Sequence, residues 1–239
     1  MKALIDADNI AFACAASGED FDNPGIACSR ADEMLEGIIR DCGADSYELW
    51  LSGGTNFRYK VYPEYKANRL DAYRPKWERE VRQHLVDSWQ ANTTDGIEAD
   101  DMLGVRQCTS TASGDSTIIC HLDKDINQIP GWHFNWELKR LGNVIREKRQ
   151  YFVTPEEADY NFFYQLLVGD PTDNIKGVPG IGPKKATALL SQGDRRGWFD
   201  VCLNAYGSEE ELDMNAKCVY IWRKENDNWK NLLDGLKED

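Results

Sequence analysis

The sequence lacks the features that mark zinc-binding, secreted and membrane-spanning proteins. Its seven cysteines form no CxxC pair and its three histidines have no zinc-ligand spacing, so we expect no structural zinc. An odd, scattered set of cysteines is typical of buried, reduced thiols. The apolar run at the N-terminus covers only residues 3–5 before Asp6, which is too short for a signal peptide or a membrane span. We therefore expect a cytoplasmic protein with no membrane partner.

An overall positive charge is also lacking. The 239 residues include 28 Lys and Arg against 41 Asp and Glu, and the formal net charge is −13. This balance argues against a nucleic-acid binder held by its total charge. Carboxylates that gather for metal ions would make the total negative while basic patches elsewhere contact DNA. The local distribution of charge is therefore more informative than the total.

The first half of the chain alternates short apolar stretches with amphipathic ones. Three apolar stretches predict buried parallel strands, at residues 3–5, 47–51 and 117–122. Between them we predict helices, one capped by Ser29 and ending near Gly43 and another beginning near Ala99. This alternation predicts an α/β fold with a mostly parallel central sheet flanked by helices.

Acidic residues gather at the predicted strand ends and helix starts, where ligand sites of open α/β sheets lie. Four motifs, IDADN, EADD, DKD and DPTDN, supply the candidate ligands Asp6, Glu98, Asp100, Asp101, Asp123, Asp125, Asp170 and Asp173. Any one of them alone would most simply cap a helix. If they converge, each close pair would repel by about 1 to 4 kcal/mol, and only cations would make that arrangement stable.

Oxygen-only ligands indicate magnesium or manganese, and the number of carboxylates indicates two ions. Two such ions give a definite mechanism for hydrolysis of a phosphodiester. One ion activates the attacking water and the other stabilises the leaving 3′ oxygen. Lysines near the scissile phosphate would neutralise charge that grows in the transition state.

Residues 57–82 differ from the acidic average. They hold eight basic and only four acidic residues, interleaved with tyrosines and a tryptophan. Such a segment offers phosphate contacts and flat rings on which unpaired bases stack, and Arg58, Lys60 and Tyr65 are our candidates for DNA contacts. The alternative is a solvated amphipathic helix, which suits residues 77–85 well and the stretch YPEYKANR badly.

Residues 169–190 join the DPTDN acids to a turn rich in glycine and proline. Asp170 and Asp173 are spaced to share one helical face and hold one cation. Backbone N–H groups of the turn, the positive end of a helix begun by Pro183, and two lysines would then bind phosphate. The candidate contacts to DNA are Gly177, Gly180, Gly182, Lys184 and Lys185. The alternative is that the turn simply connects two helices.

Together these motifs resemble the 5′ nuclease family, which includes flap endonucleases, bacteriophage 5′ to 3′ exonucleases and the 5′-nuclease domains of bacterial DNA polymerases. The resemblance covers roughly residues 3–190. GVPGIGPKK is similar to the family's helix-three-turn-helix, and YPEYKANR is similar to the start of its helical arch. The resemblance implies a PIN-like, 5′-nuclease fold. It also implies that Lys66 and Arg69 engage the scissile phosphate and that a potassium ion binds the helix-three-turn-helix.

By the same resemblance the acids divide between two metal sites. The first would use Asp6, Glu98, Asp100 and Asp101, and the second Asp123, Asp125, Asp170 and Asp173. The chain departs from the family at one place, because Ser52 or Gly53 stands where members usually carry an aspartate after the second strand. We therefore expect weaker metal binding at the first site unless Asp8 turns inward, and we expect that Gly53→Asp tightens the metal dependence.

The resemblance implies a magnesium-dependent, structure-selective 5′ nuclease, acting as a 5′ to 3′ exonuclease, a flap endonuclease or both. Its partner would be DNA with a free 5′ end, flap, nick or duplex end, and RNA of RNA–DNA hybrids remains a further substrate. One alternative is a DNA-junction binding protein of the same fold with weak or lost catalysis. Another is a PIN-like ribonuclease, which would not be expected to carry GVPGIGPKK or YKANR.

We predict a catalytic core over residues 1–160, with a helical arch at about 57–95. A helical lobe would follow over 161–239, with the helix-three-turn-helix at about 161–192. Residues 137–152 predict a basic hairpin around Gly142 and Asn143. No polymerase-like segment follows, so we expect a stand-alone, monomeric nuclease, located in the host cytoplasm if a phage encodes it.

Overall fold

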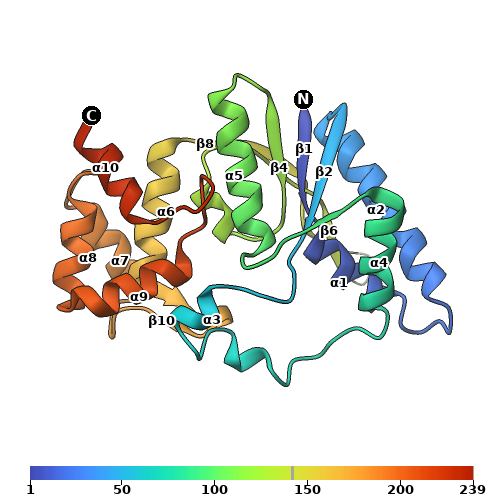
Figure 1. The fold of residues 1–239 in the computed structure, drawn as a ribbon, viewed down its shortest axis with the longest axis horizontal. Coiled ribbons are helices and arrows are strands. Elements are labelled where there is room, and N and C mark those ends of the chain that lie inside the picture. The colour runs from blue at the N-terminus through green and yellow to red at the C-terminus, as the bar shows by residue number, and fades with distance from the viewer. Residues whose placement is uncertain (141–142, 239) are drawn as a thin grey trace.

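A six-stranded sheet forms the centre of the protein (Figure 1). The computed structural model describes residues 1–140 and 143–238. The strand order is β3-β2-β1-β4-β5-β8, and every neighbouring pair is parallel except the antiparallel edge pair β5 and β8. The strands are β1 Lys2–Asp6, β2 Ser46–Leu51, β3 Asn92–Thr93, β4 Thr117–Cys120, β5 Gly131–Asn135 and β8 Arg149–Val153. The predicted mostly parallel α/β sheet is confirmed.

The three strands predicted from apolar stretches are all present. β1 lies between β2 and β4, and its register sets Asp6 opposite Trp50. The side chains of β1 and β4 are buried on both faces of the sheet, which explains why these strands are continuously apolar. Because the three strands run in parallel, their carboxyl ends and the acids that follow them lie at one edge of the sheet.

Helices cover both faces of the sheet (Figure 1). One face packs against α1 Ala7–Ser17, α2 Pro24–Cys42 and α4 Glu78–Trp89, and the other packs against α5 Ala99–Ala112. α2 ends at Gly43 as predicted, but it begins at Pro24, capped by Asn23, rather than at Ser29. Proline at the first helical position supplied the start that we missed.

The C-terminal helices form a second group beyond α5 (Figure 1). They are α6 Pro155–Val168, α7 Pro183–Leu190, α8 Trp198–Tyr206, α9 Glu209–Val219 and α10 Lys230–Glu238. α6 starts with a capping box of Thr154 and Glu157. The group has its own apolar core, in which Phe162, Phe163 and Trp229 are buried. This core fits the predicted helical lobe, while the boundary at residue 160 stays a prediction.

The segment predicted as a helical arch is helical over only about half of its length. It begins with the four-residue helix α3 Arg58–Val61, contains the 3₁₀ turn η1 Ala67–Arg69, and becomes a regular helix only at α4. Lys66 has a left-handed backbone with φ 56°, which ends any helix that approaches it. We call residues 62–77 the strap; in Figure 1 it crosses the lower edge of the molecule between α3 and α4.

Short strands complete the described chain. β6 Leu138–Arg140 and β7 Asn143–Arg146 pair antiparallel, as the predicted hairpin requires, although Gly142 at its turn lies outside the described residues. β9 Gly169–Asp170 and β10 Ile175–Lys176 pair around the 3₁₀ turn η3 Pro171–Asp173. Another 3₁₀ turn, η2 Asp125–Gln128, follows β4. Within the described residues, no helix is both long and apolar enough to span a membrane.

Candidate active site

A pocket of about 600 Å³ opens at the carboxyl edge of the sheet. Its walls come from the ends of β1, β2 and β4, the start of α5, the strap and η3. Seven of the eight predicted acidic ligands line it, namely Asp6, Glu98, Asp100, Asp123, Asp125, Asp170 and Asp173. Lys66 and Arg69 line it as well. The tertiary structure therefore brings together residues that lie more than a hundred positions apart.

Five of these acids, which we call the strand-end acids, have almost no cationic partner. They are Asp6, Asp100, Asp123, Asp125 and Asp170. In residues 1–140 and 143–238, the one ion pair that reaches any of them joins Lys124 Nζ to Asp125 Oδ1 at 3.7 Å. Asp6 and Asp170 instead cap helical turns through the backbone N–H groups of Asp8 and Thr172. Local folding thus fixes their position without neutralising their charge.

Burial and mutual repulsion perturb this group strongly. Burial and the nearby Asp8 raise the pKa of Asp6 to about 7. Burial, followed by the charges of Asp123 and Asp170, raises the pKa of Asp125 to about 7. Burial, together with Asp6 and Asp123, raises the pKa of Asp100 well above its usual value. The charged form of these carboxyls is therefore unfavourable in the absence of a nearby cation.

The chemistry of the strand-end acids fits a hard divalent cation. All the donors are carboxylate oxygens, which magnesium and manganese prefer. Across the described parts of the chain, however, no three His, Cys, Asp or Glu side chains are already grouped as a metal site. The carboxylates therefore share a pocket and would have to draw closer together to hold an ion.

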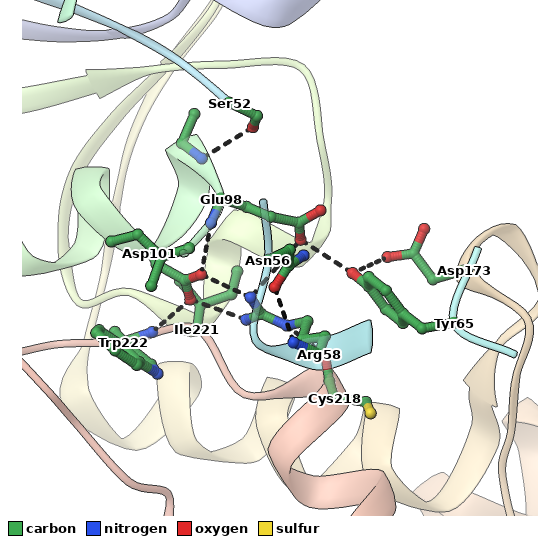
Figure 2. Close-up of polar contacts among 12 residues, drawn as sticks. Ser52, Asn56, Arg58, Tyr65, Glu98, Asp101, Asp173, Cys218, Ile221 and Trp222 are labelled. Atoms are coloured by element: carbon green, nitrogen blue, oxygen red, sulfur yellow. Dashed lines mark hydrogen bonds and ion pairs between the residues drawn. The ribbon is translucent and has the colours of Figure 1, made fainter. Parts of the chain in front are cut away.

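Glu98 and Asp173 have a different environment, because the strap supplies them with cations. Lys66 Nζ contacts Glu98 Oε1 and lies 3.6 Å from Asp173 Oδ2, and Arg69 contacts Asp173 Oδ1. The Tyr65 hydroxyl lies 2.9 Å from Glu98 and 2.8 Å from Asp173 (Figure 2). Although burial raises the pKa of Glu98, Arg58 and Lys66 hold it below its usual value.

Asp101 is not a plausible metal ligand, so that prediction is corrected. Its side chain is fully buried and both oxygens are occupied by the Arg58 guanidinium, at 2.6 and 2.8 Å (Figure 2). It also accepts the backbone N–H groups of Glu98 and Trp222, both at 3.1 Å. Asp101 therefore fastens the start of α5 to α3 and to the C-terminal segment.

The predictions that Arg58 and Tyr65 contact DNA are wrong for the same reason. Arg58 is 2% exposed, and its guanidinium also donates hydrogen bonds to the carbonyls of Cys218 and Tyr220. Tyr65 is 2% exposed and packs in the core of the C-terminal helices. Tyr59, which packs edge-on against Tyr65 and also lines the pocket, is 47% exposed and can be reached from solvent. Lys60 is exposed, and its contact with DNA stays a prediction.

The strap binds directly to η3, so two of the predicted motifs contact each other. Asn68 donates to the Pro171 carbonyl at 2.8 Å, and Arg69 Nε donates to the Thr172 carbonyl at 3.0 Å. The backbone N–H of Lys66 donates to the Asp173 carbonyl at 2.9 Å. YKANR and DPTDN therefore form one unit that holds Lys66 and Arg69 over the acids.

Known exonucleases and DNA polymerases are similar in sequence to this chain. The chain is 30% identical to a 5′–3′ exonuclease of Buchnera aphidicola over 194 residues, which is 74% of this chain and 63% of that protein. It is 30% identical over 176 residues to a DNA polymerase I of Bacillus caldotenax, covering 67% of this chain and 18% of the polymerase. It is also 32% identical over 138 residues to an exodeoxyribonuclease of Enterobacteria phage T3, covering 56% and 43%. The chain thus spans less than two thirds of the length of each relative, and no family model matches it.

Solved structures match over the whole chain. The D15 protein of phage T5, crystallised with metal ions, aligns with a TM-score of 0.67 and 21% identity over 100% of this chain and 97% of that one. The T5 D15 flap endonuclease complexed with DNA and metal ions aligns with a TM-score of 0.68 and 19% identity, covering 99% and 98%. The shared fold and the related sequences agree. The chain is similar in sequence and in fold to the 5′ nuclease family.

The predicted helix-three-turn-helix of the family lies between α6 and α7. Gly180 has φ +74°, and a Cβ on Gly177 would lie 2.3 Å from the backbone of Val168, so both positions require glycine. Gly182 precedes Pro183, which is the first residue of α7 as predicted. Lys184 and Lys185 are exposed at the start of this helix. Contact of these residues with DNA stays a prediction.

Sequence reasoning missed a buried histidine that supports the DKD acids. His121 Nδ1 lies 2.6 Å from the carbonyl oxygen of Asp123, and its Nε2 lies 3.0 Å from Nδ1 of His133. Burial lowers the pKa of His121 to about 3 and that of His133 to about 4. Both rings therefore stay neutral and help to position the loop after β4. The one available signal was the place of His121 just before LDKD.

Proposed function

We propose that this protein is a divalent-metal-dependent, structure-selective 5′ nuclease that hydrolyses DNA phosphodiesters as a 5′ to 3′ exonuclease, a flap endonuclease or both. The observation that carries the proposal is the pocket itself. It sets the five strand-end acids, which have almost no cationic partner, in one pocket with Lys66 and Arg69, which the strap holds on η3. Such a pocket accepts divalent cations and a phosphate together.

Each part of the pocket then has a defined role. The strand-end acids hold the divalent ions, for which we propose two Mg²⁺ or Mn²⁺. When bound, such ions supply an activated water and stabilise the leaving oxygen. Lys66 and Arg69 pass from Glu98 and Asp173 to the scissile phosphate and neutralise its growing charge. Asp173 is then released to serve the second metal site.

The remaining surface positions the DNA. Lys184 and Lys185 at the start of α7, with Gly177, Gly180 and Gly182, contact the phosphates of a duplex, and a potassium ion is proposed at this element. Lys60 and Tyr59, both exposed, contact the 5′ strand. The substrate is DNA with a free 5′ end, flap, nick or duplex end, and RNA–DNA hybrids are a further candidate. We propose a monomer that acts in the cytoplasm, the host's where a phage encodes it.

The test is digestion of 5′-labelled flap, nicked and blunt duplexes with Mg²⁺, sized for mononucleotides against flap-length products. Asp125→Ala should abolish cleavage while DNA binding persists, since Asp125 lines the pocket without supporting the fold. Asp115→Ala is the matched control, because Asp115 is an exposed acid just before β4, at the opposite end of that strand from the pocket.

The alternative, a junction-binding protein of the same fold with weak or lost catalysis, draws its support from Ser52 and Gly53, where the sheet edge has no carboxylate. It predicts binding of flap and nicked DNA without any product. Full cleavage by the Asp125→Ala variant would instead show that the strand-end acids do not have the proposed role in catalysis.

A further inference from the structure

The end of β2 has no acid and cannot take one at Gly53. A Cβ at Gly53 would lie 2.0 Å from the carbonyl oxygen of Thr94, because β3 packs closely beside it. Ser52 already uses its side chain, since Ser52 Oγ accepts the N–H of Ala99 at the start of α5 at 3.0 Å. A carboxylate for this part of the pocket must therefore come from another element.

Asp8 reaches that place from the neighbouring strand. In the parallel register Asp6 is opposite Trp50, so Asp8 and Ser52 each lie two residues farther along adjacent chains. The backbone N–H of Ser52 donates to Asp8 Oδ2 at 3.0 Å and to Oδ1 at 3.2 Å. The Asp8 carboxylate thus rests on the end of β2, and it lines the same pocket as Asp6 and Asp100.

Two features hold Asp8 there. It lies in the first turn of α1, where the helix dipole favours a negative charge. Arg82 of α4 donates to Asp8 Oδ1 at 2.6 Å and also contacts the Ser52 carbonyl. The side chain of Asp8 is still 31% exposed, so its carboxylate keeps lone pairs that face the pocket.

We infer that Asp8 supplies the carboxylate that the end of β2 lacks and takes part in holding a divalent cation in this pocket. The inference rests on the proposed function, because it assigns a further residue to the metal site of that nuclease. It also explains how a chain with Gly53 keeps a complete set of acids. The competing explanation is that Asp8 merely tethers α4 to the sheet through Arg82.

Asp32 offers a matched control for that competing explanation. It also tethers α4, through His84 Nε2 at 2.7 Å and Trp89 Nε1 at 2.6 Å. Its side chain is 37% exposed, close to the value for Asp8, but it does not line the pocket. Asp32→Asn therefore removes the same charge and a similar tether without touching the proposed site.

The experiment is a calorimetric titration of the full chain with Mn²⁺ in the absence of DNA. Asp8→Asn should weaken the affinity by about tenfold or more, as expected for loss of one group of a metal site, whereas Asp32→Asn should leave it unchanged. Adding Ser52→Asp to Asp8→Asn should restore most of the affinity, because an aspartate there can still accept the Ala99 N–H. Thermal melting of each variant establishes that it is folded.

The outcomes separate this inference from the proposed function. If the wild-type chain binds Mn²⁺ and Asp8→Asn binds it equally well, Asp8 is only a tether and the inference is wrong. Equal losses for Asp8→Asn and Asp32→Asn would also overturn it. If the wild-type chain binds no Mn²⁺, the metal site of the proposed function is contradicted, and the inference about Asp8 is then wrong as well.

Discussion

Acidic residues of the same motifs have two opposite environments in this protein. Asp100 and Asp101 are neighbours in sequence, yet Asp100 faces the pocket among other acids while Asp101 is locked by Arg58. Asp6 and Asp125 share the environment of Asp100, and Glu98 and Asp173 are paired with cations of the strap. The residue type is the same in both environments. What differs is which other elements of the fold contact each side chain.

This comparison separates function from stability. An unpaired buried carboxylate costs free energy in the metal-free protein, so its presence indicates a ligand that the chain does not supply. A carboxylate with a bidentate arginine is satisfied and contributes to the fold. Four experiments test this contrast.

The largest effect is expected at Asp100. Asp100→Asn should lower Mg²⁺-dependent cleavage by about 1,000-fold or more, since it removes a proposed metal ligand. The same change should raise the melting temperature of the metal-free protein at pH 8, because it removes a buried charge repelled by Asp6 and Asp123. Cleavage assays and thermal melts check the two parts, and a variant that loses stability would contradict the contrast.

Asp101→Ala should act in the opposite way. It leaves the buried Arg58 guanidinium without its partner and should lower the free energy of unfolding by about 3 to 5 kcal/mol. Urea denaturation measures this loss. Asp115→Ala, at an exposed acid, should change the free energy of unfolding by less than about 0.5 kcal/mol. If the Asp101→Ala variant keeps its stability but binds metal more weakly, Asp101 is a metal ligand and our correction is wrong.

Gly53→Asp tests the end of β2. We expected from the sequence that this change would tighten the metal dependence, but the structure leaves no room for a Cβ beside Thr94. It should therefore destabilise the protein by about 1 to 3 kcal/mol, as overpacking usually does. Ser52→Asp, one residue earlier, should be tolerated. Equal stability of the two variants, measured by urea denaturation, would argue against the close contact.

The smallest effect is a pH dependence of the metal-free protein. The pKa of Asp6 and of Asp125 is raised to about 7 in the folded state, so between pH 4 and 7 the folded chain binds more protons than the unfolded one. Its stability should therefore fall as pH rises through that window. Because Mg²⁺ competes with these protons, it should raise the melting temperature more at pH 8 than at pH 5. An equal rise at both values would contradict this.

Much of the site could be predicted from short motifs. IDADN, EADD and DKD follow strands or begin a helix, so their shared edge follows from the parallel sheet once that sheet is predicted. Pro183 marked a helix start correctly because the preference for proline at the first helical position depends on local backbone geometry alone. The strap was predicted less well, because the left-handed backbone of Lys66 depends on its contacts with η3.

Local sequence patterns were enough to predict the order of the elements, the acids at the strand ends, the glycine turn before α7 and the resemblance to the 5′ nucleases. These features depend on local patterns of apolar, acidic and turn-forming residues. The three-dimensional contacts were needed to show that Asp101 pairs with Arg58, that Tyr65 is buried in the core, and that the Asp8 carboxylate rests on the end of β2. Each of these depends on a partner at least 33 positions away along the chain, and spacing within a motif carries no information about such a partner.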